Sequence, residues 1–320
     1  MPKEFVHYII AKNVLLKLRE DPFWKDICNF ETELYLGSIF PDALYSATGT
    51  VDASILRFPD ALHGANAEDS LDIIKKNIPP LSVGQSGLQK AAFLVGVISH
   101  IFADATFHPL VYYFTGNYYD ADEMKRLRAM RAHRRFECVL DIWFAGGIRQ
   151  LKAYQLYRLL DNVPNFPDIL DFMAAGAFPT DGAAFSKIFL KCYQNYCLLR
   201  KLYTSAFFQR LIVPFDTVLP LRLSGLTAVA YNTRDVKYAK RLDGDLAFRI
   251  PMTGEQQKSS LEELAVRATA DAVNCCGLLK DFLLKRNMDF MNSVGPSLET
   301  GIPNTHAGKM MCFAQTDFFR

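Results

Sequence analysis

Apolar residues recur every three or four positions along most of this 320-residue chain. Sustained alternation of apolar and polar residues, which is typical of a half-buried strand, is hard to find. Half of the residues are apolar, so the chain can bury one large core. The periodicity therefore predicts an all-α fold. The expected helices cover residues 3–19, 31–38, 69–77, 86–106, 121–145, 149–160, 167–175, 182–212 and 256–286.

The charge balance and the chain ends exclude several classes of protein. Thirty-six basic and 34 acidic residues leave a net charge of +2, which gives no general field for nucleic acid or anionic lipid. Residues Met1 to His7 lack the basic and apolar regions of a signal peptide, so we expect a cytoplasmic protein. The longest uncharged apolar stretch, Ala91 to Ala103, is shorter than the roughly 20 residues of a transmembrane helix. No membrane span is expected.

The strongest motif closes the apolar helix expected over residues 86–106. His100, Asp104 and His108 follow one another at intervals of four residues. At about 100° per residue they fall within roughly 80° of one another, so three ligand-type side chains share one helical face. Pro109 is expected to disturb the last turn, which would place His108 just past the regular helix and aim it at a different ion from His100.

A second pair, His133 and Glu137, is spaced i to i+4 in the helix expected over residues 121–145. This spacing brings an imidazole and a carboxylate together on one helical face. Taken alone, the pair is more typical of a surface salt bridge, and the neighbouring Arg134 and Arg135 fit a solvated face equally well.

Three further candidate ligands precede these residues. His7 lies near the apolar stripe of the first helix, Asp42 follows a proline in an expected loop, and His63 follows an apolar segment. Taken singly, Asp42 is better explained as a helix cap, and a lone histidine such as His63 as a hydrogen-bonded partner.

Their joint distribution favours a metal site. Five of the six histidines lie before residue 134, each near a carboxylate. The seven cysteines are odd in number and form no CxxC pair, so a thiolate site is not indicated. Imidazole and carboxylate ligands suit hydrolytic zinc, although manganese, iron or nickel use the same set. Eight candidate ligands are too many for one ion and indicate two or three.

In the order of these candidate ligands, the chain resembles the zinc-dependent phospholipase C family, which is related in fold to the S1/P1-type nucleases. The resemblance lies in the order of an N-terminal His, a Pro-Asp, a single His, a His-x-x-x-Asp followed by a His, and a His-x-x-x-Glu. It covers about the first 140 residues. The matching residues are His7, Asp42, His63, His100, Asp104, His108, His133 and Glu137.

The resemblance implies an architecture, namely one multi-helix domain of the phospholipase C and P1 nuclease type with additional C-terminal helices. Residues 1–145 would form the metal-binding helical core, and residues 146–290 would complete the same domain. Residues 291–320, which are rich in glycine and proline, would form an irregular C-terminal tail.

The resemblance also implies how zinc would be divided among the ligands. Asp42, His63, His100 and Asp104 would hold one ion, and Asp104 would bridge to a second ion that also binds His7. The remaining histidines and the glutamate would hold a third.

Two departures from the family pattern concern these ions. Mature family members are secreted and use a freed N-terminal tryptophan as a ligand, whereas this chain begins Met-Pro. The third ion's first ligand, His108, follows Asp104 by only four residues, which is closer than in the family.

The implied function is a metal-dependent phosphoester hydrolase, above all a phospholipase C-like phosphodiesterase using zinc-activated water, with Asp42 accepting the water's proton. Its partner would be a phosphoester, with a phospholipid headgroup as the first candidate; no partner protein is indicated. The alternatives are a cytosolic S1/P1-like nuclease or small-phosphoester phosphatase, and a non-catalytic metal-binding helical protein.

Two groups of residues bear on the choice of substrate. Aromatic residues that would either line an acyl-chain wall or, in the favoured interpretation, pack in the core are Trp24, Phe40, Tyr112, Tyr113 and Phe114. Basic residues that would serve a nuclease or simply solvate a helix are Arg126, Arg128, Arg131, Arg134 and Arg135.

Overall fold

A computed structural model describes residues 4–47, 53–78, 84–152, 155–178, 180–205, 207–208, 210, 227–316 and 318–319. The described part is mainly helical, which confirms the predicted all-α class. The helices are α1 (Glu4–Leu18), α2 (Glu31–Gly37), α3 (Phe40–Ala43), α4 (Ala53–Leu62), α5 (Asp72–Asn77), α6 (Gln85–Thr115), α7 (Glu123–Phe144), α8 (Leu156–Asp161), α9 (Phe166–Ala177), α10 (Gly182–Tyr203), α13 (Val236–Ala239), α14 (Leu261–Lys285) and α15 (Asp289–Asn292). Strands β1 (Leu246–Arg249) and β2 (Gln256–Ser259) pair antiparallel, with Leu246 opposite Ser259.

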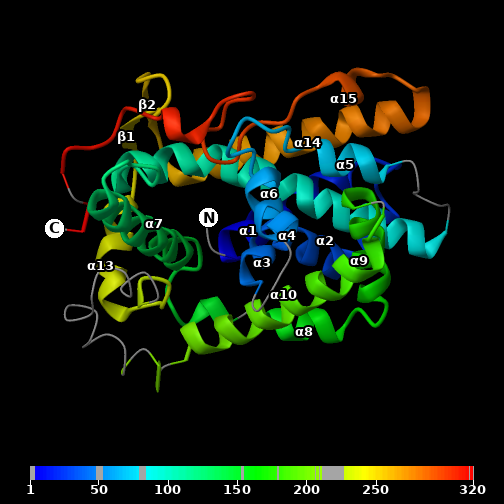
Figure 1. Cartoon of the computed structure of the whole chain (residues 1–320), viewed down its shortest axis with the longest axis horizontal. Helices are drawn as coiled ribbons and strands as arrows, with labels where there is room; N and C mark the ends of the chain where they lie inside the picture. Colours follow the sequence, from blue (N-terminus) through cyan, green and yellow to red (C-terminus); the bar gives the residue numbers. More distant parts are fainter. Residues whose placement is uncertain are drawn as a thin grey trace.

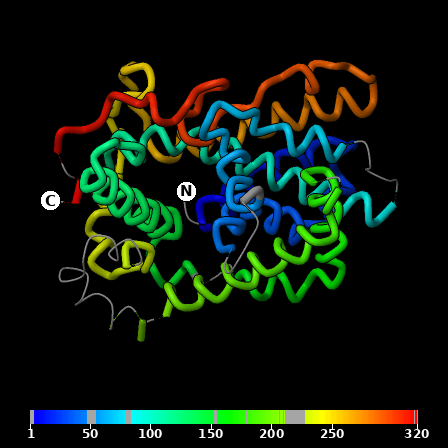
Figure 2. The backbone as a smooth tube through the Cα atoms, in the orientation of Figure 1, coloured from blue at the N-terminus to red at the C-terminus, as the bar shows by residue number. Residues whose placement is uncertain are grey.

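Helix α6 runs through the middle of the molecule, and the other long helices pack around it (Figures 1 and 2). α2 and α14 make the most extensive contacts with α6, and α1 and α7 also lie against it. α9 and α10 pack on each other on the side away from α14 and the hairpin. The four helices α1, α3, α6 and α7 meet where the candidate ligands lie.

By length and composition alone, α6 is apolar enough to cross a membrane, whereas the sequence analysis expected no such segment. Eighteen consecutive residues of α6 meet this description, and 83% of them are buried inside the protein. This degree of burial is typical of the core helix of a globular protein.

The expectation that Pro109 would end the helix is wrong. α6 continues through Pro109 to Thr115 and ends only at Gly116, whose φ of 93° lies in a region that favours glycine. Pro109 has no N–H to donate to the carbonyl of Ala105. Gly301 of the C-terminal segment packs against this carbonyl so closely that a Cβ at residue 301 would lie 2.5 Å from its oxygen. The C-terminal segment thus packs directly on the turn that contains Pro109, and the helix is continuous there.

Other boundaries also differ from the prediction. Residues 256–259, expected as helix, form β2, and α14 begins after Ser260, whose side chain and that of Glu263 form a capping box. The predicted helix 149–160 is a short 3-10 turn followed by α8. α3 and α4 were not predicted. The predicted helix 182–212 corresponds to α10, and its far end lies partly outside the described residues.

Two glycines let α2 approach α6 closely. A Cβ on Gly37 would lie 2.0 Å from the Phe93 carbonyl oxygen, and a Cβ on Gly96 would lie 2.0 Å from the Leu34 carbonyl oxygen. The adjoining residue, Ser38, has its backbone carbonyl turned toward the site. Close backbone contact therefore fixes the position of a carbonyl that the site uses.

Replacing Gly96 with Ala is expected to destabilise the protein by about 3 kcal/mol, because the methyl group would force the two helices apart. Gly277→Ala is the control, because a Cβ at this helical position meets no atom within 4 Å. It should be neutral or slightly stabilising. The free energy of unfolding in urea measures both, and equal values for the two variants would contradict the close approach.

Candidate metal centre

Two clusters of buried ligand-type side chains lie along α6. We call His7, Asp42, His63, His100 and Asp104 the inner cluster, and His108, His133 and Glu137 the outer cluster. α1 supplies the first member of the inner cluster, α3 the second, the turn after α4 the third and α6 the last two. α6 and α7 supply the outer cluster. The structure thus brings together all eight residues predicted as ligands; their ligand roles remain predictions.

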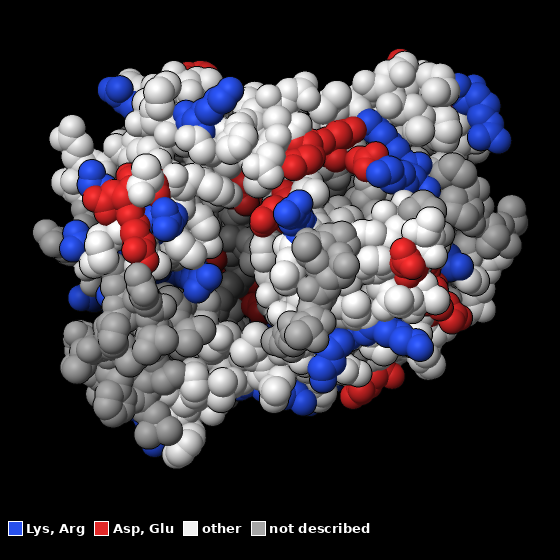
Figure 3. Space-filling model, in the orientation of Figure 1, with Lys and Arg blue, Asp and Glu red and all other residues white. Residues whose placement is uncertain are grey.

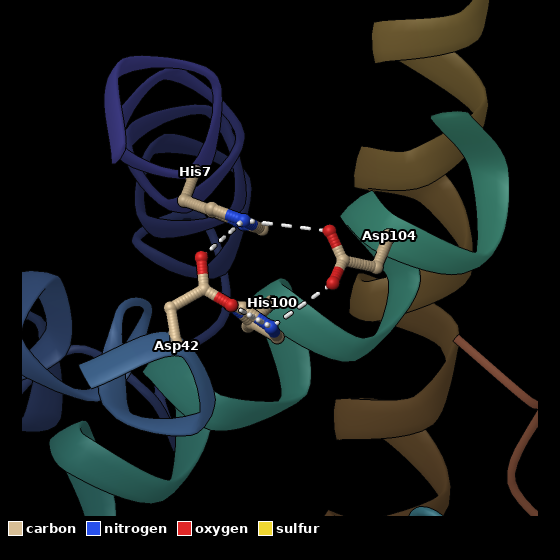
Figure 4. A group of neighbouring side chains, drawn as sticks. All are labelled: His7, Asp42, His100 and Asp104. Atoms are coloured by element: carbon tan, nitrogen blue, oxygen red, sulfur yellow. Dashed lines mark ion pairs between the residues drawn. The ribbon is translucent and has the colours of Figure 1, made fainter. Parts of the chain in front are cut away.

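The two carboxylates of the inner cluster each face imidazoles through both oxygens. Asp104 Oδ1 lies 3.4 Å from His7 Nε2, and Asp104 Oδ2 lies 3.2 Å from His100 Nε2 and 3.6 Å from His63 Nε2. Asp42 Oδ2 lies 3.6 Å from His7 Nε2, and Asp42 Oδ1 lies 3.6 Å from the other two. Figure 4 shows four of these side chains pointing at one another from α1, α3 and α6. Each carboxylate therefore has one oxygen on the His7 side and one on the opposite side.

These spacings fit a metal site. Ligand atoms held by one tetrahedral zinc at about 2.0–2.2 Å lie roughly 3.3–3.5 Å from one another. The imidazole-to-carboxylate separations of the inner cluster are 3.2 to 3.6 Å, and all but the shortest exceed the usual range of an N–H···O hydrogen bond. Asp104 Oδ1 and Oδ2 and both ring nitrogens of His7 are buried without a hydrogen-bond partner. Such groups are costly to bury unless something else binds them.

Backbone carbonyls orient three of the rings. Nδ1 of His63 donates to the Pro59 carbonyl at 2.7 Å, and Nδ1 of His100 donates to the Ser38 carbonyl at 2.8 Å. In the outer cluster, Nδ1 of His108 bonds a backbone carbonyl in the same way. Because a carbonyl only accepts, Nδ1 carries a proton and Nε2 is the ring atom that faces the cluster. Nε2 of all three rings is buried without a hydrogen-bond partner.

Electrostatics hold most of these groups in the state that binds a cation. Burial lowers the pKa of His7 from 6.5 to about 4 and also lowers the pKa of His108. Burial raises the pKa of the Asp104 carboxyl, but nearby imidazoles lower it by more, to well below its ordinary value. Burial lowers the pKa of His63, but the two carboxylates raise it by more, to about 9. At neutral pH His63 therefore carries an additional proton, which metal binding would displace.

The outer cluster joins α6 to α7. His133 Nε2 lies 3.0 Å and His108 Nε2 lies 3.8 Å from the same oxygen of Glu137. His108 faces a different cluster from His100, as predicted, but not because the helix ends. Eight residues of continuous helix separate the two rings by about 12 Å along the axis while keeping them on one face. Asp42, expected in a loop, likewise lies in a helix, α3.

A pocket of about 390 Å³ opens onto the outer cluster and is visible as a hollow beside α7 (Figure 3). His133 and Glu137 form part of its wall, whereas the inner cluster lies beneath it and does not line it. Most of the other described residues in the wall are aromatic or acidic; the remainder are Ala65, Asn66 and one basic residue, Arg134. The tyrosines and other acids are Tyr45, Tyr112, Tyr118, Tyr119, Asp60 and Glu299.

The C-terminal segment contributes to this site, which the sequence analysis did not predict. Leu298 touches both clusters through its backbone: its N–H donates to the His63 carbonyl at 2.8 Å, and its carbonyl accepts from His108 Nδ1 at 2.7 Å. The next residue, Glu299, accepts a hydrogen bond from the Tyr112 hydroxyl and is only 6% exposed. No local motif marks these residues, because they lie more than 150 positions after Glu137.

Comparison with known proteins identifies the family. Residues 6–180 match the family model described as zinc dependent phospholipase C. The chain belongs to the zinc-dependent phospholipase C family. The match covers more than half of the chain and includes every predicted ligand, but ends before Glu299. No curated protein and no solved structure gives a significant match. Family membership and the two clusters together support a metal-dependent phosphoesterase.

Of the aromatic and basic residues considered in the sequence analysis, some lie in the core and others line the pocket. Trp24 and Phe40 are buried in the core, as favoured, while Tyr112 is buried but lines the pocket. Among the arginines, Arg135 pairs with Asp235 and packs against aromatic rings, and Arg134 lines the pocket.

Proposed function

We propose that this family member is a phospholipase C-like phosphodiesterase that binds two or three zinc ions through the inner and outer clusters. The observation that carries the proposal is that α6 connects both clusters and that, among the described residues, His133 and Glu137 of the outer cluster line a pocket. Three protein ligands and an open face are typical of a catalytic zinc site.

The division of labour among the residues follows from their positions. Bound zinc would supply Lewis-acid polarisation of the phosphoryl group and would lower the pKa of a water molecule to about 7. His108, His133 and Glu137 would place a phosphoester at the floor of the pocket. The family resemblance assigns to Asp42 the role of accepting the proton of the attacking water. Imidazoles lower the pKa of Asp42 by more than burial raises it, which keeps it ionised at neutral pH, although it lies in the inner cluster and not in the pocket wall.

The pocket wall favours a phosphodiester that carries a cationic group. Tyr45, Tyr118 and Tyr119 line the pocket together with the carboxylates of Asp60 and Glu299. Aromatic faces and carboxylates both attract ammonium groups. Arg134 is the one basic side chain in the wall, which is little for a polyanion. A zwitterionic phospholipid headgroup therefore fits this wall better than nucleic acid does.

Glu299→Gln is expected to raise the KM for phosphatidylcholine by about tenfold, because it removes a charge that faces the ammonium group. It should change the KM for phosphatidylglycerol much less. Glu33→Gln is the matched control, because Glu33 is also 6% exposed but lies on α2, outside the pocket wall. Hydrolysis of mixed micelles by the zinc-loaded protein gives both constants.

The same assay decides between the candidate functions. Preferential hydrolysis of single-stranded DNA would favour a nuclease instead. Zinc binding without turnover of any phosphoester would leave a non-catalytic metal protein. A cytoplasmic location is also part of the proposal, and the free thiols of all seven cysteines are compatible with it. Cell fractionation tests it.

A further inference from the structure

A buried carboxylate outside both clusters joins the helices that carry them. Asp141 on α7 is fully buried. It accepts hydrogen bonds from the backbone N–H groups of Phe5 at 3.2 Å and Val6 at 3.0 Å, and from the Tyr231 hydroxyl at 2.6 Å. The first two bonds reach the first turn of α1, directly before His7. Asp141, which lies 135 positions after Val6 in the sequence, thus binds the first turn of α1.

The spacing on α7 connects this contact with the outer cluster. Asp141 follows Glu137 by four residues and His133 by eight, so all three lie on one face of α7. The same helical face therefore supplies two members of the outer cluster and the acceptor that holds α1. Because α1 carries His7, the position of α7 affects the position of His7 in the inner cluster.

We propose that Asp141 is a positioning residue that sets the affinity of the inner cluster for the ion on the His7 side. This inference rests on the metal binding in the proposed function. The first-turn N–H groups of a helix have no partner within the helix, and a carboxylate that accepts two of them fixes both the axis and the rotation of that turn. His7 follows one residue after Val6, so its ring moves with this turn.

The remaining contacts of His7 cannot replace this anchor. Neither of its ring nitrogens has a hydrogen-bond partner, so no backbone carbonyl orients the ring as carbonyls orient those of His63 and His100. Its ring stacks on the ring of His100, with centroids 4.0 Å apart, and its backbone position depends on the placement of α1. Groups that orient a ligand from outside the coordination sphere typically change metal affinity by about 10- to 100-fold.

Asp141→Asn tests the proposal. The amide matches the carboxylate in size, but its NH₂ group would oppose a backbone N–H. Asp235→Asn is the matched control, because Asp235 is 1% exposed and accepts charge-assisted bonds from Arg135, a residue of α7. Tyr231→Phe is the second variant; it removes one donor and leaves both backbone bonds, so it should fold and show a smaller change in the same direction.

The measurements are the zinc content of the full-length protein and its zinc dissociation constants from chelator competition. We expect Asp141→Asn to raise the dissociation constant of one zinc ion by about 10- to 100-fold. Asp235→Asn should leave all zinc dissociation constants unchanged. Added to His7→Ala, Asp141→Asn should have no further effect, whereas its effect should persist in His133→Ala. Unchanged affinities in Asp141→Asn, or equal weakening of every ion, would overturn the proposal. A wild-type protein without zinc would instead refute the proposed function itself.

Discussion

Replacing Asp104 with Asn is expected to lower kcat/KM for a phosphodiester by at least about 10³-fold. Asp104 is fully buried and, like Asp42, faces three imidazoles through its two oxygens; its separation from His100 is the shortest of these contacts, at 3.2 Å. An amide offers one acceptor oxygen and would turn N–H groups toward the ligand nitrogens. Loss of metal-ion catalysis amounts to several kcal/mol, and each 1.4 kcal/mol is about tenfold in rate.

The zinc content of the variant distinguishes this cause from unfolding. We expect Asp104→Asn to remain folded, to retain the zinc of the outer cluster and to lose zinc from the inner one. Asp235→Asn, which also removes a buried carboxylate, should keep both zinc content and turnover. An Asp104→Asn protein with wild-type turnover would show that the inner cluster has no part in the reaction.

Removal of metal is expected to lower the melting temperature on the order of 5–10 °C. A ligand present at 1,000 times its dissociation constant stabilises the folded state by about 4 kcal/mol, and each kcal/mol corresponds to a few degrees in a chain of this size. Without metal, the buried acceptors of the inner cluster would have no bonding partner. Thermal unfolding with and without a chelator measures the shift.

The control is whether the change in melting temperature depends on which metal is added back. Zinc added back in excess of the chelator should restore the melting temperature. Calcium should not, because it prefers six or more oxygen ligands and the clusters are rich in imidazole. A melting temperature that is the same with and without chelator would mean that the buried clusters are stable without any ion.

The periodicity of the sequence was sufficient to predict the helical class. Helical spacing indicated which ligands share a face of one helix, whereas the grouping of all eight ligands came from the family resemblance. His100, Asp104 and His108 share a face because of helix geometry alone, which any continuous helix enforces. The error at Pro109 arose because local rules treat a helix as isolated, whereas here Gly301 packs against the carbonyl that proline leaves unpaired. Tertiary contacts of this kind have no local signature.

The start of α14 could have been predicted more closely. Ser260 and Glu263 have the spacing of a capping box, and the structure shows both of its hydrogen bonds. This pattern marks the helix start and leaves residues 256–259 for a strand.

The pocket wall could not have been predicted from the sequence. Glu299 and Leu298 reach the site from the far end of the chain, and their placement depends on packing across the whole fold. Asp141 has the i to i+4 spacing that would connect it with Glu137, but its partners are backbone groups of α1, which no side-chain motif reveals.

The most direct test of the two-cluster metal site is the zinc content of the purified full-length protein, measured after gel filtration in metal-free buffer. We expect at least two zinc ions per chain in the wild type, with one lost in His7→Ala and a different one lost in His133→Ala. A wild-type protein that retains less than one ion per chain after zinc loading would contradict the metal site and the hydrolytic function that rests on it.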